Sequence, residues 1–217
     1  MKRSELAVFI DHTLLKPEAV SGDIEKLCGE AVQYGFASVC VNPIWVKTAS
    51  VILEESEPFV CSVIGFPLGA TNSMAFEAAK AVNNGASELD MVLPVGYLKS
   101  GYTKKTADFI SDVIHASSGV PVKVILETCL LTDEEKTLAC RISLDSGASW
   151  VKTSTGFGTG GATTADIILM KRAVGDKIGV KASGGIRTLE DSLSMISAGA
   201  RRLGCSRSVE IVKSLDV

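Results

Sequence analysis

The sequence predicts an α/β protein in which eight parallel strands close into a (β/α)8, or TIM, barrel after a short N-terminal helix. Short apolar stretches alternate with helix-like stretches along the whole chain of 217 residues. This alternation is typical of parallel strands joined by helical crossovers. The chain length also falls inside the range of this fold, near its lower end.

Eight ranges are predicted as strands because they are short, rich in apolar and β-branched residues, and bounded by Gly or polar residues. In chain order they are 8–13, 37–42, 59–65, 87–93, 122–127, 149–153, 178–182 and 201–205. The barrel would therefore use the whole chain, and its last strand would end a few residues before the last helix.

Helical patterns lie between these strands, for example over 73–82 and 132–140. The second begins with Thr132 and Glu135, the spacing of a capping box. Glycine follows several helices just before a strand, as is usual for helix stops; these are Gly35, Gly85, Gly147 and Gly199.

The alternative fold is a doubly wound open sheet. Such a sheet usually has fewer strands and a Gly-rich turn after the first one. Here the first strand ends in Asp11-His-Thr13, and the Gly-rich loops come late. No linker is visible, so we expect one barrel domain over residues 1–217.

Composition excludes several classes of protein. The net charge is −3 with both signs interspersed, which argues against a nucleic-acid partner. No apolar run reaches the roughly 18 residues of a membrane span, and the N-terminus lacks the apolar core of a signal peptide. Six cysteines without a CxxC pair predict reduced thiols in the cytoplasm. His12 and His115 are far apart, so a catalytic zinc is not expected.

Polar residues at the ends of the predicted strands are the candidate site, because barrel active sites lie at the carboxyl ends of the strands. They are Asp11, Thr13, Asn42, Asp90, Glu127, Lys152 and Lys181. Lys123 stands at the start of its strand, toward the opposite face, and we interpret it as structural.

Lys152 and Lys181 lie near the ends of adjacent predicted strands. A lone lysine there can bury its stem and keep its amine in water. If both point inward, two ammonium groups about 6 Å apart would repel by about 3 kcal/mol at an effective dielectric of 20. That equals roughly two pKa units, enough to leave one amine neutral for Schiff-base chemistry. Asp90 is the candidate acid/base, with an ion-pairing or capping role as its alternative.

Phosphate binding is the second indication. Ala182-Ser-Gly-Gly-Ile-Arg187 follows the seventh strand, and Leu203-Gly-Cys-Ser-Arg-Ser208 follows the eighth. Loops at these places form the usual phosphate site of a barrel. The backbone amides expected to hold an anion are those of Gly184, Gly185, Gly204 and Ser206. Arg207 either adds charge or is a solvated residue of the first helical turn.

Taken together, these motifs resemble the deoxyribose-phosphate aldolase family over nearly the whole chain. The matching segments are 11–15, 64–70, 85–92, 123–132, Val151-Lys-Thr-Ser-Thr-Gly-Phe157 and Val180-Lys-Ala-Ser-Gly-Gly-Ile-Arg187. The last two are the most specific of them.

The resemblance implies a class I aldolase, without metal or cofactor, that reversibly cleaves 2-deoxy-D-ribose 5-phosphate to D-glyceraldehyde 3-phosphate and acetaldehyde. It implies that Lys152 forms the Schiff base, that Asp90 moves protons, and that Lys181 tunes Lys152. Substrate contacts are expected from Thr155, Asp11 and Thr13 besides the four phosphate residues. Members are commonly dimers or tetramers, so a homo-oligomer is expected.

Two departures from the family pattern stand out. Members often have Gly-Thr-Ser-x-Gly where this chain has Gly204-Cys-Ser-Arg-Ser208. The chain also ends at Val217 without the C-terminal tyrosine that assists proton transfer in some members, so another group or water would replace it.

Two further functions remain open on the sequence alone. Another phosphosugar enzyme on the same barrel, an isomerase, an epimerase or a related aldolase, would share the phosphate loops; the first two would need no lysine pair. A barrel that only binds a phosphosugar would keep its ligand affinity without Lys152.

Overall fold

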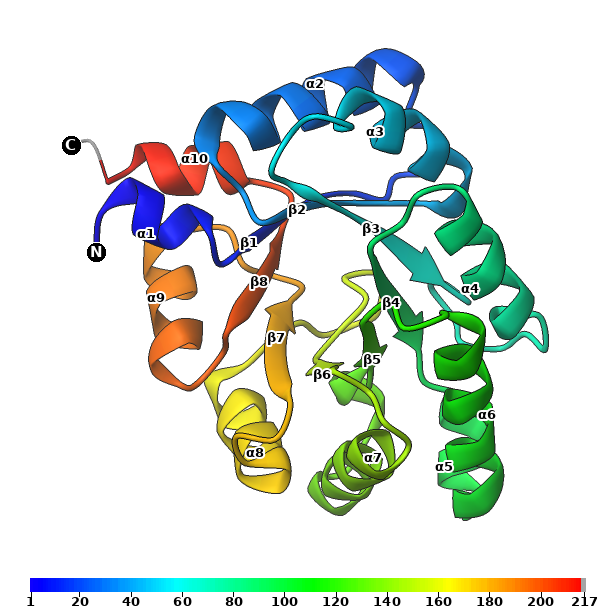
Figure 1. Cartoon of the computed structure of the whole chain (residues 1–217). Helices are drawn as coiled ribbons and strands as arrows, with labels where there is room; N and C mark the ends of the chain where they lie inside the picture. The colour runs from blue at the N-terminus through cyan, green and yellow to red at the C-terminus, as the bar shows by residue number, and fades with distance from the viewer. Residues whose placement is uncertain (216–217) are drawn as a thin grey trace.

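The computed structural model describes residues 1–215. The chain end at Asp216 and Val217, which lacks the tyrosine of some family members, lies outside the described residues. Eight strands form a closed barrel in the order β1 to β8, each parallel to the next, and β8 pairs with β1 (Figure 1). The predicted (β/α)8 barrel is confirmed. The single-domain assignment to residues 1–217 stays a prediction.

The strands agree with their predicted ranges to within two residues at either end. They are β1 Ile10–Leu14, β2 Ser38–Val41, β3 Phe59–Ile64, β4 Glu88–Val92, β5 Val122–Ile125, β6 Trp150–Lys152, β7 Gly179–Ser183 and β8 Arg202–Cys205. The largest difference that bears on the site is at β5, which ends before Glu127.

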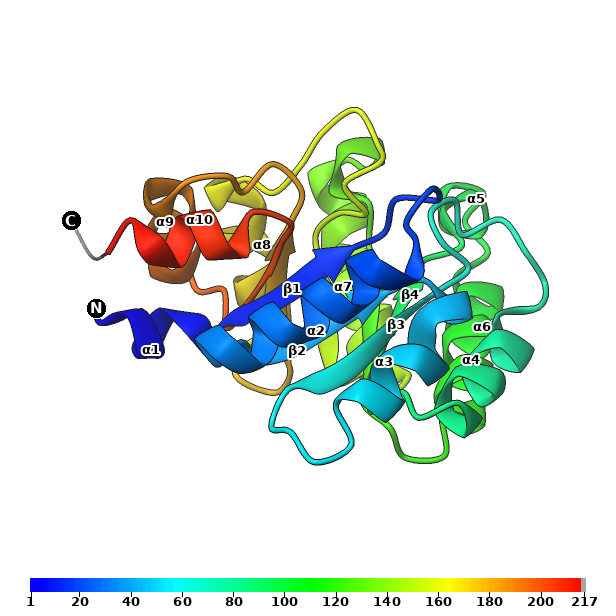
Figure 2. The ribbon, with the colours of Figure 1, turned by 90° about the horizontal axis from the view of Figure 1, so that it is seen from above.

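The helices lie outside the barrel, and α1 lies beside α10 near the chain ends (Figures 1 and 2). They are α1 Arg3–Ala7, α2 Ser21–Tyr34, α3 Val46–Ile52, α4 Met74–Asn83, α5 Val95–Lys99, α6 Thr103–Ala116, α7 Asp133–Asp145, α8 Thr164–Val174, α9 Leu189–Ser197 and α10 Ser208–Lys213. Short 3₁₀ turns span Pro43–Trp45 and Thr128–Leu130. In the described part of the chain, no helix combines the length and the apolar character that crossing a bilayer requires.

The predicted capping box is present at the start of α7. Thr132 Oγ1 accepts from the Glu135 amide at 3.3 Å, and Glu135 Oε2 accepts from the Thr132 amide at 2.8 Å. Both donors belong to the first turn of a helix, where no intrahelical acceptor exists. The box therefore fixes where the chain leaves the loop after β5.

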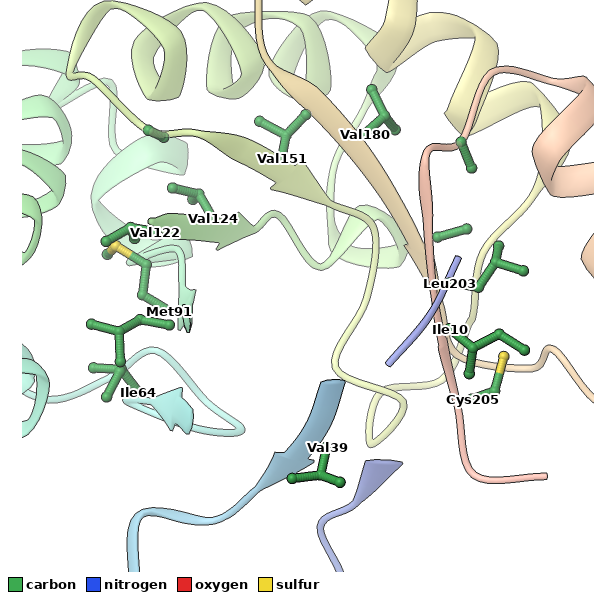
Figure 3. Packing of buried hydrophobic residues seen from close by; sticks show 14 of the residues in the cluster. Ile10, Val39, Ile64, Met91, Val122, Val124, Val151, Val180, Leu203 and Cys205 are labelled. Carbon is green, nitrogen blue, oxygen red and sulfur yellow. The ribbon is translucent and has the colours of Figure 1, made fainter. Parts of the chain in front are cut away.

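Alternation along the strands separates an apolar layer from a charged interior, because neighbouring side chains point to opposite faces. One set packs between the barrel and its helices as the main core, including Ile10, Met91, Val124, Val151 and Leu203 (Figure 3). The other set points into the barrel and carries most of the charged strand residues. The helix-covered face thus holds the fold, and the enclosed face is available for chemistry.

Trp150 and Arg202 show how the interior below the lysines is filled. The Arg202 guanidinium lies 5.4 Å from the centre of the Trp150 ring. Gly179 is the register partner of Trp150 on β7, and a Cβ there would lie 2.0 Å from the ring. A glycine is thus needed for the indole to fit.

Candidate active site

Seven acidic and basic side chains gather inside the barrel, each from a strand. They are Asp11 on β1, Glu88 and Asp90 on β4, Lys123 on β5, Lys152 on β6, Lys181 on β7 and Arg202 on β8. Apart from Arg202, with a side-chain exposure of 12%, all are nearly or fully buried. Four cations therefore share three carboxylates, and with all groups ionised the cluster carries one net positive charge. Charges this deep in a protein require such partners.

Asp90 is the centre of the cluster and contacts three lysines. Its Oδ2 accepts from Lys152 Nζ at 2.8 Å and from Lys181 Nζ at 2.7 Å. Its Oδ1 lies 3.1 Å from Lys123 Nζ and accepts from the Cys61 thiol at 3.2 Å. Burial alone would raise the pKa of Asp90, but the three lysines outweigh burial and hold it well below the usual value. Asp90 is therefore a carboxylate in the resting site.

Lys181 is held as a cation between two carboxylates. Besides Asp90, its amine bonds Asp11 Oδ2, and Asp11 Oδ1 accepts from Arg202 at 2.7 Å. Burial would lower the pKa of Lys181, yet Asp11 and Asp90 raise it well above the usual lysine value. Both carboxylate oxygens of Asp11 already accept hydrogen bonds, one from Lys181 and one from Arg202. This placement favours a role in holding Lys181 over direct contact with substrate.

Lys152 has fewer anionic partners than the other cations of the cluster. Within residues 1–215 its amine bonds one carboxylate oxygen, Asp90 Oδ2, whereas Lys123, Lys181 and Arg202 each contact two carboxylates. Loss of one proton would balance the charge of the cluster. Lys152 is thus the cation that the carboxylates of the cluster stabilise least. The geometry thus distinguishes Lys152 from Lys181, which the sequence pattern alone left equivalent.

The register of the barrel brings the two lysines together. Lys152 and Lys181 are Cα partners on β6 and β7. Because both amines bond the same oxygen, their nitrogens are separated by no more than about 5.5 Å, the sum of the two bond lengths. The predicted separation of about 6 Å is slightly larger than this limit.

The predicted placement of Lys123 on the opposite face, away from the candidate site, is wrong. Lys123 was assigned to that face as structural, but its fully buried amine contacts Asp90 and donates to Glu88 Oε2 at 2.6 Å. Glu88 and Arg202 were also missed. The sequence signal that could have identified these residues is a charged side chain inside a short apolar strand. In the barrel, Asp90 is the register partner of Lys123.

The predicted phosphate residues gather at the ends of β7 and β8. Gly184 and Gly185 have φ of +86° and +80°, a conformation that L side chains rarely adopt. The amides of Gly184, Gly185 and Ser206 donate to no protein acceptor among residues 1–215. At Gly204 a Cβ would lie 2.9 Å from Ser183 Cβ and 3.3 Å from Lys181 Cε, so a larger residue would crowd both side chains. We call Gly184, Gly185, Gly204 and Ser206 the cradle.

The loop after β6 packs onto the cradle. The Ala162 amide donates to the Gly184 carbonyl at 2.9 Å, and a Cβ on Gly161 would lie 2.4 Å from that oxygen. The loop that carries the chain away from Lys152 is thus fixed against the cradle. The loop after β6 and the cradle are therefore in direct contact.

Thr155 and Glu127 form a buried pair at the mouth of the barrel. The Thr155 hydroxyl donates to Glu127 Oε2, and the Thr155 amide lies 3.4 Å from both Glu127 oxygens. Glu127 has φ of +55°, uncommon outside glycine. The contacts show the pair fixing the loop after Lys152.

Thr13 and Asn42 also bond the protein itself. Thr13 Oγ1 donates to the Asp11 carbonyl at 2.8 Å, and Asn42 Nδ2 donates to the Leu15 carbonyl at 3.1 Å. A hydroxyl oxygen can still accept a bond while donating one. Thr13 is half-buried beside β8, and its oxygen keeps acceptor capacity toward a ligand.

The departures at Cys205 to Ser208 leave the cradle free of a thiol. Cys205 faces the outer core rather than the interior (Figure 3), and burial raises its pKa to about 12. Ser208 Oγ donates to the Cys205 carbonyl at 3.0 Å. Arg207 is exposed, with Nη1 3.8 Å from Glu210 Oε2.

Cys40, Cys61 and Asp90 form a group with metal-ligand spacing that the sequence did not reveal. Their ligand atoms lie within 4.8 Å of one another, and all three residues are buried. Both Asp90 oxygens already contact lysine amines. A cation bound there would meet three ammonium groups, so this group is a poor metal site.

Comparison with known proteins places this chain in a family. A family profile described as DeoC/LacD family aldolase matches residues 5–209. The chain belongs to this aldolase family. A deoxyribose-phosphate aldolase from Carboxydothermus hydrogenoformans is 56% identical over 218 residues, covering 98% of this chain and 96% of the relative. One from Streptococcus gordonii is 56% identical over 211 residues, covering 96% of each chain.

Solved structures agree with this family assignment. A putative deoxyribose-phosphate aldolase from Coccidioides immitis has a TM-score of 0.97 at 41% identity, covering 100% of this chain and 88% of that one. The deoxyribose phosphate aldolase from Aeropyrum pernix, described as having a unique tetrameric structure, has a TM-score of 0.92 at 35% identity, covering 99% and 92%.

Replacing Lys181 tests the charge balance of the cluster. Lys181→Met removes a cation beside Lys152, so the protonated form of Lys152 is favoured and the acid limb of the kcat/KM profile moves to higher pH. At neutral pH we expect activity to fall on the order of a hundredfold. Lys181→Arg keeps the charge and should leave the acid limb in place even if activity falls. An acid limb that stays unchanged in Lys181→Met would remove Lys181 from this role.

Proposed function

We propose that this aldolase reversibly cleaves 2-deoxy-D-ribose 5-phosphate to D-glyceraldehyde 3-phosphate and acetaldehyde through a Schiff base on Lys152. The observation that carries the proposal is the unequal lysine pair: Lys181 bonds two carboxylates, and Lys152 bonds one oxygen of Asp90. Strong sequence identity to curated deoxyribose-phosphate aldolases supports the choice of substrate.

The reaction begins at the neutral amine of Lys152. The amine adds to C1 of the open-chain sugar, and loss of water gives an iminium ion. The iminium accepts the electron pair of the C2–C3 bond as the C3 hydroxyl loses its proton, which releases D-glyceraldehyde 3-phosphate and leaves an enamine. Protonation of the enamine at C2 and hydrolysis of the new iminium release acetaldehyde and restore the amine.

Asp90 moves protons in this proposal. As a carboxylate 2.8 Å from Lys152 Nζ, it takes the proton that the amine must lose. Its neighbours Lys181 and Lys123 remain charged and stabilise the carboxylate between steps. The same oxygen that contacts Lys152 also contacts Lys181, so a proton has a short path between the two amines.

The cradle binds the 5-phosphate by backbone amides. Amides of Gly184, Gly185 and Ser206 have no protein acceptor within residues 1–215, as a site for an anion requires. Thr155, Asp11 and Thr13 complete the proposed site: Thr155 through the loop it fixes, Asp11 through Lys181, and Thr13 by its acceptor oxygen.

Location and assembly belong to the same proposal. The six cysteines are free thiols, which supports a reducing compartment such as the cytoplasm. We expect a homo-oligomer, a dimer or a tetramer. Exposed Leu68, Phe76 and Ile44 supply apolar surface of the kind that subunit contacts bury.

Lys152→Arg should abolish cleavage of 2-deoxy-D-ribose 5-phosphate while the fold is retained. Arginine stays protonated and cannot form the imine. Release of D-glyceraldehyde 3-phosphate is followed with a coupled dehydrogenase, and circular dichroism checks the fold. Lys105→Arg, on the surface of α6, is the matched control and should behave as wild type. Substantial cleavage by purified Lys152→Arg would refute the assignment of the nucleophile.

Ser206→Glu should selectively impair the phosphorylated substrate. A carboxylate in the cradle repels the phosphate, whereas the lysines and Asp90 are untouched. We expect kcat/KM for 2-deoxy-D-ribose 5-phosphate to fall by at least about tenfold, since phosphate binding energy positions the carbonyl against Lys152. Slow cleavage of unphosphorylated deoxyribose should change little. Equal fractional losses on the two substrates would place the phosphate site elsewhere.

A further inference from the structure

His12 is buried outside the barrel, between β1, α2 and the start of α10. Strand alternation turns it away from Asp11, so it takes no part in the lysine cluster, and only 4% of it is exposed. Its ring packs against Phe36 with a centroid distance of 5.1 Å. The proposed reaction at Lys152 gives this residue no role.

Both ring nitrogens of His12 have partners. Nε2 lies 2.8 Å from Glu30 Oε2 on α2, and Nδ1 lies 3.0 Å from Ser208 Oγ at the start of α10. Ser208 Oγ in turn lies 3.0 Å from the Cys205 carbonyl at the end of β8. A continuous line of polar contacts therefore joins α2 to the two ends of the turn 205–208.

This turn contains Ser206, one of the cradle residues. Ser206 and Arg207 are exposed, and Arg207 has its charged partner, Glu210, in the helix that follows it, α10. Among residues 1–215, His12 is the residue from outside 205–210 whose side chain bonds the turn. A contact made from β1 thus reaches the turn that carries the Ser206 amide.

We propose that His12 is a positioning residue for phosphate recognition, acting through Ser208 to fix the turn 205–208 so that the Ser206 amide faces the phosphate. The inference rests on the proposed function and adds a determinant outside the barrel interior. Glu30 holds the ring from the other side and is itself 3.9 Å from Lys26 Nζ.

Two substitutions at His12 separate its two contacts. The side-chain amide nitrogen of Asn occupies nearly the place of Nδ1, so His12→Asn keeps the bond to Ser208 and loses Glu30. The amide of Gln reaches the place of Nε2, so His12→Gln keeps Glu30 and loses Ser208. Ser208→Ala removes the shared hydroxyl alone and should reproduce His12→Gln. The chain has one other histidine, exposed His115 on α6, and His115→Asn is the matched control.

We expect His12→Gln and Ser208→Ala to raise KM for 2-deoxy-D-ribose 5-phosphate about tenfold, as the loss of one buried hydrogen bond allows, with kcat nearly unchanged. His12→Asn should stay within about threefold of wild type, and a His12→Gln/Ser208→Ala double variant should lose no more than either single one. Deoxyribose kinetics should be unchanged throughout. Equal losses in His12→Asn and His12→Gln, or equal losses on both substrates, would overturn the proposal.

Binding of inorganic phosphate, measured by calorimetry, gives a readout that needs no turnover. The dissociation constant should rise in His12→Gln and Ser208→Ala by the same factor as KM, and stay near wild type in His12→Asn. An unchanged dissociation constant in Ser208→Ala would overturn the proposal even if activity fell. Failure of the wild-type chain to cleave the sugar phosphate would instead count against the proposed function and leave this binding test intact.

Discussion

The site depends on one buried carboxylate that contacts three amines. Asp90 could not remain ionised inside the barrel without Lys123, Lys152 and Lys181, and the lysines could not remain there without it. Because Lys181 also forms an ion pair with Asp11, the carboxylates are distributed unevenly among the lysines. This unevenness is the basis for proposing Lys152 as the nucleophile.

The barrel makes such a cluster possible. Its outer face packs against helices and supplies the apolar burial, so the enclosed face can carry charge without opening the core. Parallel register then sets Lys152 beside Lys181 and Asp90 beside Lys123. The loops after β7 and β8 supply the backbone amides that we propose as the phosphate end of the site.

Much of this could be predicted from the sequence, because the signals are local. Strand ranges follow from short apolar runs, the start of α7 from Thr132 and Glu135, and the candidate nucleophile from a lysine at a strand end. The sharing of Asp90 is not local. It depends on how neighbouring strands are staggered in the barrel. Lys123 stands at the start of its own strand, which suggested the opposite face, but its register partner on β4 is Asp90, which it contacts. The gathering of Cys40 and Cys61 beside Asp90 was hidden for the same reason.

Trapping of the imine tests the central claim most directly. The wild-type chain is incubated with acetaldehyde, reduced with borohydride, digested and examined by mass spectrometry. An ethyl group on the peptide that contains Lys152, and none on the peptide that contains Lys181, is the predicted result. Modification of Lys181 or Lys123 in preference to Lys152, or no reduced adduct at all, would contradict the charge distribution on which the account rests.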